Sequence, residues 1–304
     1  MRLIFKFHLR EITGRRTNWR NYGSATTLRG ALFCGAVLVF VLASSQADAT
    51  GGISGSKLAT PSADTVPSLK MEFEPYFSLR YDLRELDSGW RRNKLDLKHK
   101  GFEAGFRFTV GLINNLEAGI VLPVVFEKEW DEEQRLSGTG LGDIPLGLKW
   151  NFLCRDAFTF AWHGGVTTPT GQSDVGEDEL PTGTGAVITE TGLIGTFLPT
   201  ENLSIDANLM LGLGWPVNDF GDKSLDLTFE LAAGYAFGNF QLVLELNQTH
   251  SFGDVHTASL FSLNAGFTWE LNPQVIIVTG PRVDFAGKSQ REAITYNLAF
   301  TILL

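Results

Sequence analysis

The fifteen residues from 69 to 83 alternate between apolar and polar side chains almost without a break. Successive side chains of a β-strand point to opposite faces, so this period of two predicts a strand rather than a helix. Strands of globular proteins usually run about 5–6 residues, whereas a tilted strand that crosses a membrane needs roughly 9–11. A strand this long, with one apolar and one charged face, indicates a wall between lipid and water.

Eleven further stretches with the same alternation follow, which makes twelve strands. Their connections alternate between short turns, near residues 114, 155, 200, 238 and 272, and long loops, near residues 90, 133, 177, 220, 254 and 288. An even number of strands with short periplasmic turns and long extracellular loops is typical of outer-membrane barrels, whereas a soluble sandwich gives no reason for this order. We therefore predict an all-β fold, a transmembrane antiparallel β-barrel of about twelve strands, over residues 68–304.

The N-terminus has a different character. Residues 1–30 carry seven basic side chains and one acid, and an apolar run of thirteen residues, 31–43, follows. Ala47 and Ala49 place small residues at the cleavage-determining positions, so we expect a cleaved signal peptide over residues 1–49 and export to the outer membrane of a Gram-negative cell. A membrane anchor is the alternative, although thirteen residues are short for a span. The Gly-, Ser- and Thr-rich residues 50–67 are expected to form a flexible periplasmic lead.

Charged side chains of the strands share the phase opposite to the apolar face. Charges that face lipid are costly, so we expect these side chains to line the lumen, either as a polar solute path or as ion pairs that fill a narrow barrel. Ten of the sixteen are carboxylates, which suggests a mild cation preference. The predicted lumen-lining residues are Glu72, Arg80, Asp82, Arg84, Glu103, Arg107, Glu117, Asp143, Lys149, His163, Glu190, Asp206, Glu230, Glu245, Glu270 and Arg282. The predicted lipid-facing residues include Leu79, Phe106, Leu148, Leu211 and Leu244.

One hairpin has a specific register. A two-residue loop of Gly238 and Asn239 makes Phe237 face Phe240, because these residue types suit the tightest hairpin turns. Residues directly opposite on paired strands share a face. The further pairs are therefore predicted to be Tyr235–Leu242, Ala233–Leu244 and Leu231–Leu246 toward lipid, and Ala232–Glu245 and Glu230–Asn247 toward the lumen.

No catalytic, cofactor or metal site is predicted. The Gly-rich runs at 137–140 and 183–185 resemble phosphate-binding loops only in composition, and the acidic loop at 174–179 lacks the regular oxygen spacing of a calcium loop. The chain has 34 acidic against 25 basic residues, so nucleic acid is not an expected partner. The expected partners are outer-membrane lipid and lipopolysaccharide, the barrel-assembly machinery during biogenesis, and a small-molecule solute.

The glycine-rich motifs resemble those of a known family. Residues 138–150 read GTGLGDIPLGLKW, and TTPTG at 167–171 and TGTG at 182–185 follow. These motifs are similar to those of outer-membrane barrels associated with the phenol meta-cleavage degradation pathway. The resemblance implies transport of aromatic or other hydrophobic compounds and carries over no catalytic residue.

We expect a porin-like channel or transporter that passes small, hydrophobic or aromatic solutes by diffusion, and no enzymatic activity. Two alternatives stay open: a structural or adhesive barrel without transport, and an outer-membrane lipid-modifying enzyme. Such an enzyme would need a Ser and a His close together near the outer rim, on the lipid face. His163 has the lumen phase, and His250 with Ser251 has no evident third member in the sequence.

Overall fold

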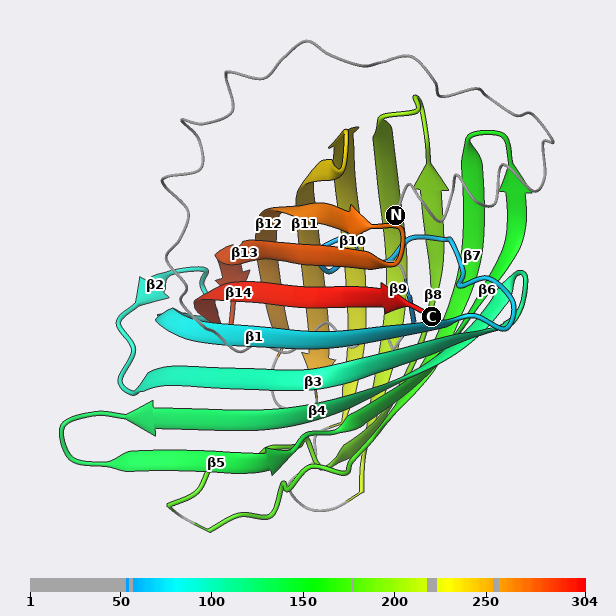
Figure 1. Cartoon of the computed structure of the whole chain (residues 1–304). Coiled ribbons are helices and arrows are strands. Elements are labelled where there is room, and N and C mark those ends of the chain that lie inside the picture. The colour runs from blue at the N-terminus through cyan, green and yellow to red at the C-terminus, as the bar shows by residue number, and fades with distance from the viewer. Residues whose placement is uncertain (1–52, 55–56, 177, 218–222, 254–256) are drawn as a thin grey trace. The chain divides into compact units, whose positions relative to one another are not determined.

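The computed structural model describes residues 53–54, 57–176, 178–217, 223–253 and 257–304 (Figure 1). All of them belong to one compact unit of the chain. The expected signal peptide, residues 1–49, lies outside the described residues. The described strands are β1 (Met71–Leu86), β2 (Arg92–Asn93), β3 (Lys98–Ile113), β4 (Leu116–Trp130), β5 (Arg135–Leu141), β6 (Ile144–Arg155), β7 (Phe158–Thr168), β8 (Ala186–Phe197), β9 (Leu203–Pro216), β10 (Ser224–Phe237), β11 (Phe240–Gly253), β12 (Thr257–Asn272), β13 (Val275–Lys288) and β14 (Gln290–Leu303).

Twelve of the described strands form one closed antiparallel barrel, which confirms the predicted fold class. The strands follow one another around the ring from β1 through β3, β4 and β6 to β14, and β14 pairs again with β1 (Figure 1). Two short strands add to this ring: β2 pairs with the end of β1, and β5 pairs with the extracellular half of β4. Within the described ranges, no helix is long and apolar enough to span a membrane.

The predicted short turns and the long connections near residues 90, 133 and 177 are confirmed. The connections near residues 220 and 254 include residues outside the described ranges, and at the second of them β11 ends at Gly253 and β12 begins at Thr257, so the expected long loop there is wrong. The expected long loop near residue 288 is a tight turn, because only Ser289, at φ 52°, separates β13 from β14. The charged residues there continue the strands, since their side chains find ionic partners: Asp284 contacts Arg282, and Arg291 contacts Asp82 and Glu129. Composition alone therefore predicts a loop where paired charges extend a hairpin beyond the membrane.

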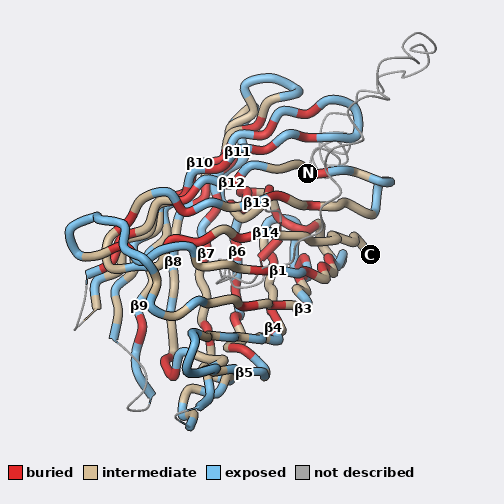
Figure 2. Tube along the Cα trace, turned by 90° about the vertical axis from the view of Figure 1, so that its left-hand side faces the viewer, coloured by how far each residue is buried: buried red, intermediate tan, exposed pale blue. Residues whose placement is uncertain are grey.

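The two faces of the wall differ in burial, and buried and exposed positions alternate along the strands (Figure 2). Four of the five apolar residues predicted to face lipid are exposed: Phe106, Leu148, Leu211 and Leu244. Leu79 has the same phase but is only 2% exposed. The larger side chains of Phe102 and Tyr296 lie directly opposite Leu79 on the two neighbouring strands. The prediction that Leu79 is exposed to lipid is therefore wrong.

The register predicted for the hairpin of β10 and β11 is confirmed at every pair. Phe237 faces Phe240, and their stacked rings lie 6.1 Å apart between centroids. Gly238 takes φ +60°, a conformation that costs glycine little. Ala232 lies opposite Glu245, which places this carboxylate toward the lumen.

Candidate functional site

The lumen holds a part of the chain that precedes the first strand. Residues 53–54 and 57–67, which we call the lumen segment, are largely buried, and Ile53, Lys57 and Val66 are each at most 1% exposed. The blue trace in Figure 1 shows this segment among the barrel strands. Composition predicts a flexible periplasmic lead, and that expectation needs correction for these residues. The reason is that the backbone amides of the segment find carboxylate acceptors in the lumen.

Glu117, near the periplasmic start of β4, is the first of these acceptors. Its Oε1 accepts the backbone amide of Ser54 at 2.7 Å, and its Oε2 accepts the hydroxyl of Ser54 and the amide of Val66, both at 2.6 Å. Lys149 on β6 lies opposite Glu117 and donates to the carbonyl oxygens of Ser54 at 2.7 Å and Ser62 at 3.1 Å. Both ends of the segment are therefore tied to one ion pair.

Glu245 on β11 is the second acceptor. Its carboxylate accepts the backbone amides of three successive residues, Leu58 at 2.8 Å, Ala59 at 3.0 Å and Thr60 at 3.3 Å. Asn264 on β12 donates to the same carboxylate at 2.7 Å and holds it in place. Hydrogen bonds to a charged acceptor are roughly twice as strong as neutral ones. Three successive backbone amides of the segment thus bind the carboxylate of Glu245, in the way that backbone amides of an anion-binding loop bind an anion.

These two acceptors stand on opposite walls. In the ring of twelve strands, β4 and β11 lie six strands apart in either direction. A chain that binds both must cross the lumen. The lumen segment therefore spans the barrel instead of following one wall.

Further wall contacts come from β8, β9 and the turn between β3 and β4, where Thr65 donates to the carbonyl oxygen of Asn114 at 3.2 Å. The amide of Ala63 donates to Thr196 Oγ1 at 2.9 Å, and Thr196 in turn donates to Asp206 at 2.6 Å. Lys57 forms a fully buried ion pair with the same Asp206. Asn208 donates to the carbonyl oxygen of Pro61 at 2.9 Å.

Apolar contacts and one glycine complete the fit. Ile53 and Ala63 of the segment pack with Ala161 and Ile194 of the wall in a small buried cluster. At Gly111 on β3, a Cβ atom would stand 2.2 Å from the carbonyl oxygen of Pro67, closer than any side chain can approach. The absence of a side chain at this position lets the segment pass next to β3.

Five of the sixteen predicted lumen residues surround the segment. Glu117, Lys149, Asp206 and Glu245 contact it directly, and Glu230 accepts a hydrogen bond at 3.0 Å from the Asn208 amide that binds Pro61. The period-two phase therefore found the charged groups that hold the segment, although the sequence did not reveal the position of the segment itself.

Six further predicted residues form contacts along the wall. Arg107 pairs with Glu74 at 2.7 Å, Arg80 with Asp82 at 2.6 Å, and His163 with Glu190 at 2.7 Å. Arg282 pairs with Asp284 at 3.3 Å. These contacts agree with ion-pair networks along the lumen wall, the second of the two expectations for these charges.

The other five predicted residues differ among themselves. Glu103 is buried and accepts the hydroxyl of Tyr76 at 2.6 Å. Glu72 is buried too, farther along β1, where it lies opposite Thr109 of β3. Glu270 is half-buried. Asp143 holds the extracellular loop instead, because it accepts the backbone amides of Gly171 and Thr184. Arg84 is exposed beyond a bulge that interrupts the alternation after Asp82, so the phase no longer places it in the lumen.

Sequence reasoning missed the residues of the segment itself and their polar partners. Ser54 and Lys57 lie in a stretch that reads as a linker, and nothing in its composition distinguishes a linker from a plug. Thr196, Asn208 and Asn264 have the lumen phase of their strands. Including uncharged polar side chains in the phase analysis would have found these three.

The outer rim contains the His–Ser contact that a lipid-modifying enzyme would need. His250 Nδ1 lies 2.8 Å from Ser259 Oγ across β11 and β12, and Gln248 contacts the other ring nitrogen. His250 lies within β11 rather than in a loop, and it shares the outward phase of Leu246. Its partner is not Ser251, which donates to Asp226 instead.

Carboxylates in two extracellular connections are engaged by the backbone. Amides of Arg91 and Gly89 donate to Asp87, and amides of Gln134 and Glu133 donate to Asp131, which holds the pKa of each carboxyl below its usual value. Across the described residues, no group of three or more His, Cys, Asp or Glu side chains could hold a metal ion.

A closed ring of twelve long antiparallel strands with an apolar outer face and a polar interior defines a transmembrane β-barrel of the outer-membrane type. A family model described as "Putative MetA-pathway of phenol degradation" matches residues 102–300, and the chain belongs to this family. No curated protein matches the chain.

The chain is similar to several solved structures. The COG4313 outer membrane channel from Pseudomonas putida F1 has a TM-score of 0.69 at 13% identity, over 80% of this chain and 98% of that one. The β domain of the Bordetella autotransporter BrkA has a TM-score of 0.47 at 14% identity, over 77% and 99% of the two chains. The CymD monoaromatic hydrocarbon channel has a TM-score of 0.41 at 9% identity, over 77% and 88%. At 13% identity the likeness to the COG4313 channel concerns the fold.

Proposed function

We propose that this protein is an outer-membrane channel for small solutes, and that the lumen segment closes it in the state described. The observation that carries this proposal is the way the lumen is filled. A barrel with a purely structural role can fill its interior with side chains from its own wall. This lumen instead receives a separate piece of chain, held mainly by hydrogen bonds that water can replace.

The polar wall supports a path for solutes once the segment leaves. Glu117, Lys149 and Glu245 would then face water, as the lumen groups of water-filled barrels do. The excess of carboxylates over cations along the wall favours cations. The family description names a phenol degradation pathway, which supports an aromatic compound as the solute.

Flux measurements test this proposal. Charged aromatic compounds cross lipid slowly, so benzylammonium and benzoate can be loaded outside proteoliposomes and their uptake compared with that of glycerol. We expect uptake that depends on the protein and favours benzylammonium over benzoate. A correctly folded barrel that admits none of the three, with or without residues 53–67, would contradict a channel function and support a structural barrel.

The contact between His250 and Ser259 favours a second function, hydrolysis of a lipid ester at the outer rim. His250 Nδ1 would accept the hydroxyl proton while Ser259 Oγ attacks the ester carbonyl, and the imidazolium would return that proton to the alcohol that leaves as the ester C–O bond breaks. Water would then hydrolyse the acyl group from Ser259. This candidate is weaker, because Ser259 is only 6% exposed and no described carboxylate orients the imidazole. Covalent labelling of the folded protein with a fluorophosphonate, lost in Ser259→Ala, would support it. No labelling would remove it.

A further inference from the structure

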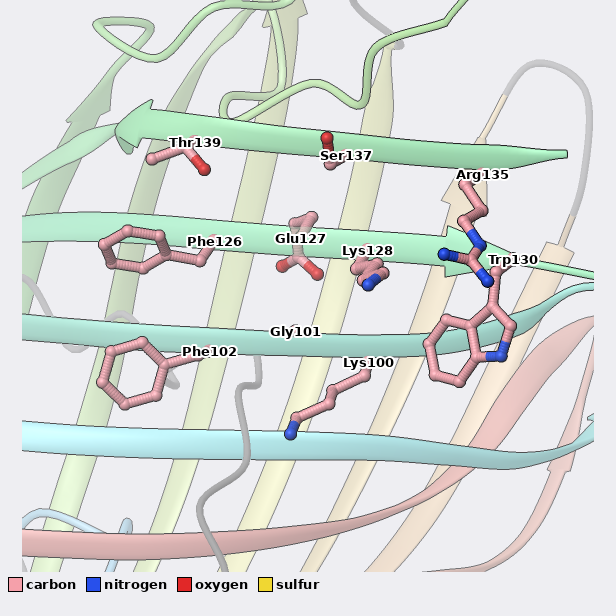
Figure 3. Close-up of a pocket in the computed structure, with 10 residues that line it drawn as sticks. All are labelled: Lys100, Gly101, Phe102, Phe126, Glu127, Lys128, Trp130, Arg135, Ser137 and Thr139. Carbon is pink, nitrogen blue, oxygen red and sulfur yellow. The ribbon is translucent and has the colours of Figure 1, made fainter.

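Three basic side chains stand together on the outer wall of the barrel. Lys100 on β3, Lys128 on β4 and Arg135 on β5 border a cavity of about 540 Å³ (Figure 3). Glu127 also borders the cavity, but its carboxylate lies 2.8 Å from His99 Nε2 and belongs to that pair. His99 and Glu127 have the lumen phase, so their neighbours Lys100 and Lys128 point the opposite way. The cavity therefore opens outside the channel.

These cations lack the partners that other basic residues have. Nearby Arg92 and Arg291 pair with Glu292 and Glu129. By contrast, no carboxylate of the described residues forms an ion pair with Lys100, Lys128 or Arg135, although the whole chain carries a net charge of −9. Aromatic rings lie beside the two lysines instead: Lys100 Nζ is 5.0 Å from the Tyr81 ring and Lys128 Nζ is 6.0 Å from the Trp130 ring.

The two lysines also lie directly opposite each other in the register of β3 and β4. Like charges in this position repel each other and destabilise a sheet. An anion between the two ammonium groups would remove that repulsion. Arg135, on the third strand, adds a side chain that can bind a phosphate through two parallel hydrogen bonds.

The height of this cluster on the wall indicates where the anion comes from. The outward positions of β4 from Leu116 to Phe126 are all apolar, and Lys128 is the first charge beyond them. On β3, Lys100 likewise follows Phe102, whose ring centroid lies 5.6 Å from that of Phe126. Eleven residues match the length of a membrane-crossing strand, so the cations lie at the extracellular border of the lipid.

We propose that this surface, the basic outer site of Lys100, Lys128 and Arg135, binds a phosphate group of lipid A, the phosphorylated glycolipid of the outer leaflet. Phe102 and Phe126 below the cations would contact an acyl chain. Trp130, Ser137 and Thr139 around the cavity offer stacking and hydroxyl groups for the sugar (Figure 3). Three cations suit a phosphate monoester, which carries more charge than the phosphodiester of a phospholipid.

The acidic tip of the β4–β5 hairpin does not neutralise this site. Glu132 and Glu133 are exposed there and form no ion pair with Arg135 among the described residues. Asp131 is occupied by the backbone amides of Glu133 and Gln134. The inference does not depend on transport, because the basic outer site faces away from the lumen.

Lipid A titration of the full-length protein in detergent micelles tests the site, with binding followed by native mass spectrometry. The triple variant Lys100→Gln/Lys128→Gln/Arg135→Gln should bind lipid A at least about tenfold more weakly, since each cation at a membrane surface contributes to anionic lipid binding. Lys223→Gln is the matched control, because Lys223 Nζ also lies over an exposed ring, 5.9 Å from that of Trp215. The control should bind as the wild type does.

Two further ligands identify the chemistry. Lipid A without phosphate should bind the wild type as weakly as intact lipid A binds the triple variant, and phosphatidylglycerol should bind less tightly than lipid A. Equal binding of phosphatidylglycerol, undiminished binding of dephosphorylated lipid A, or equal losses in the triple variant and Lys223→Gln would overturn the proposal. If the triple variant does not fold, Lys128→Gln alone should still show a severalfold loss. Conductance should be unchanged in all of these variants, which separates this site from the channel.

Discussion

Glu117 Oε1 and Lys149 Nζ lie 3.2 Å apart on facing positions of β4 and β6, fully buried, and both bind Ser54. A buried ion pair tolerates the loss of both partners better than the loss of one, because a single survivor keeps its charge without compensation. Whichever of Glu117 and Lys149 remains would also keep its hydrogen bond to Ser54 of the lumen segment. The pair thus connects barrel stability with closure.

Lys149→Met should destabilise the folded barrel by about 3 kcal/mol, at the lower end for a broken buried pair because Glu117 retains the donors of Ser54 and Val66. The double variant Glu117→Gln/Lys149→Met should lose less than the sum of the two single variants. Urea unfolding in micelles, followed by heat-modifiable gel mobility, measures both quantities. Strict additivity would show that the two groups do not interact.

Glu245→Gln removes the charge that three backbone amides share. Charge-assisted hydrogen bonds are about twice as strong as neutral ones, so we expect a loss of about 1.4 kcal/mol and a roughly tenfold rise in the open-to-closed ratio of single channels. Glu190→Gln is the control, because Glu190 pairs with His163 on the wall and not with the segment. A similar rise in both variants would argue against Glu245 as an anchor.

Gly111→Val should displace the end of the segment next to β3, since a Cβ there would stand 2.2 Å from Pro67 O and 2.4 Å from Val66 O. Limited proteolysis of the folded barrel should then cut the segment faster than in the wild type. Gly176→Val is the control, because nothing lies within 4 Å of a Cβ at that loop position. Equal cleavage rates in all three proteins would place the segment elsewhere in solution.

Gly238→Val should destabilise the β10–β11 hairpin by about 1–2 kcal/mol, because φ +60° is unfavourable for a residue with a Cβ and more so for a branched one. Gly238→Asn should cost less, since asparagine tolerates this conformation. The same urea unfolding measurement compares the two. Equal stability of the valine and wild-type proteins would mean that the turn differs from the one described.

The barrel follows from the sequence because each strand is long enough to show its phase. Charges toward the lumen and apolar residues toward lipid fix the register, so even the pair of Phe237 and Phe240 could be predicted. Where charges pair with each other beyond the membrane, as Arg291 does with Glu129 and Asp82, the same signal fails and predicts a loop instead.

The lumen segment could not be predicted for a different reason. Its binding depends on backbone amides, which every residue other than proline has, so Leu58 and Ala59 carry no mark of their contact with Glu245. The contact of His250 with Ser259 was missed because it joins two strands and depends on their register. Both the lumen segment and the contact between His250 and Ser259 can be recognised only from the three-dimensional arrangement of the strands.

A reversible lock on the lumen segment tests the channel proposal most directly. The amide of Ala63 lies 2.9 Å from Thr196 Oγ1, so the variant Ala63→Cys/Thr196→Cys places two thiols at this contact for oxidation to a disulfide. Cys154→Ser removes the exposed thiol of β6 from this background. We expect single-channel recordings to show a closed barrel when the pair is oxidised and opening events after dithiothreitol is added. Equal conductance before and after reduction, with the disulfide verified by mass, would contradict a channel closed by its own N-terminal residues.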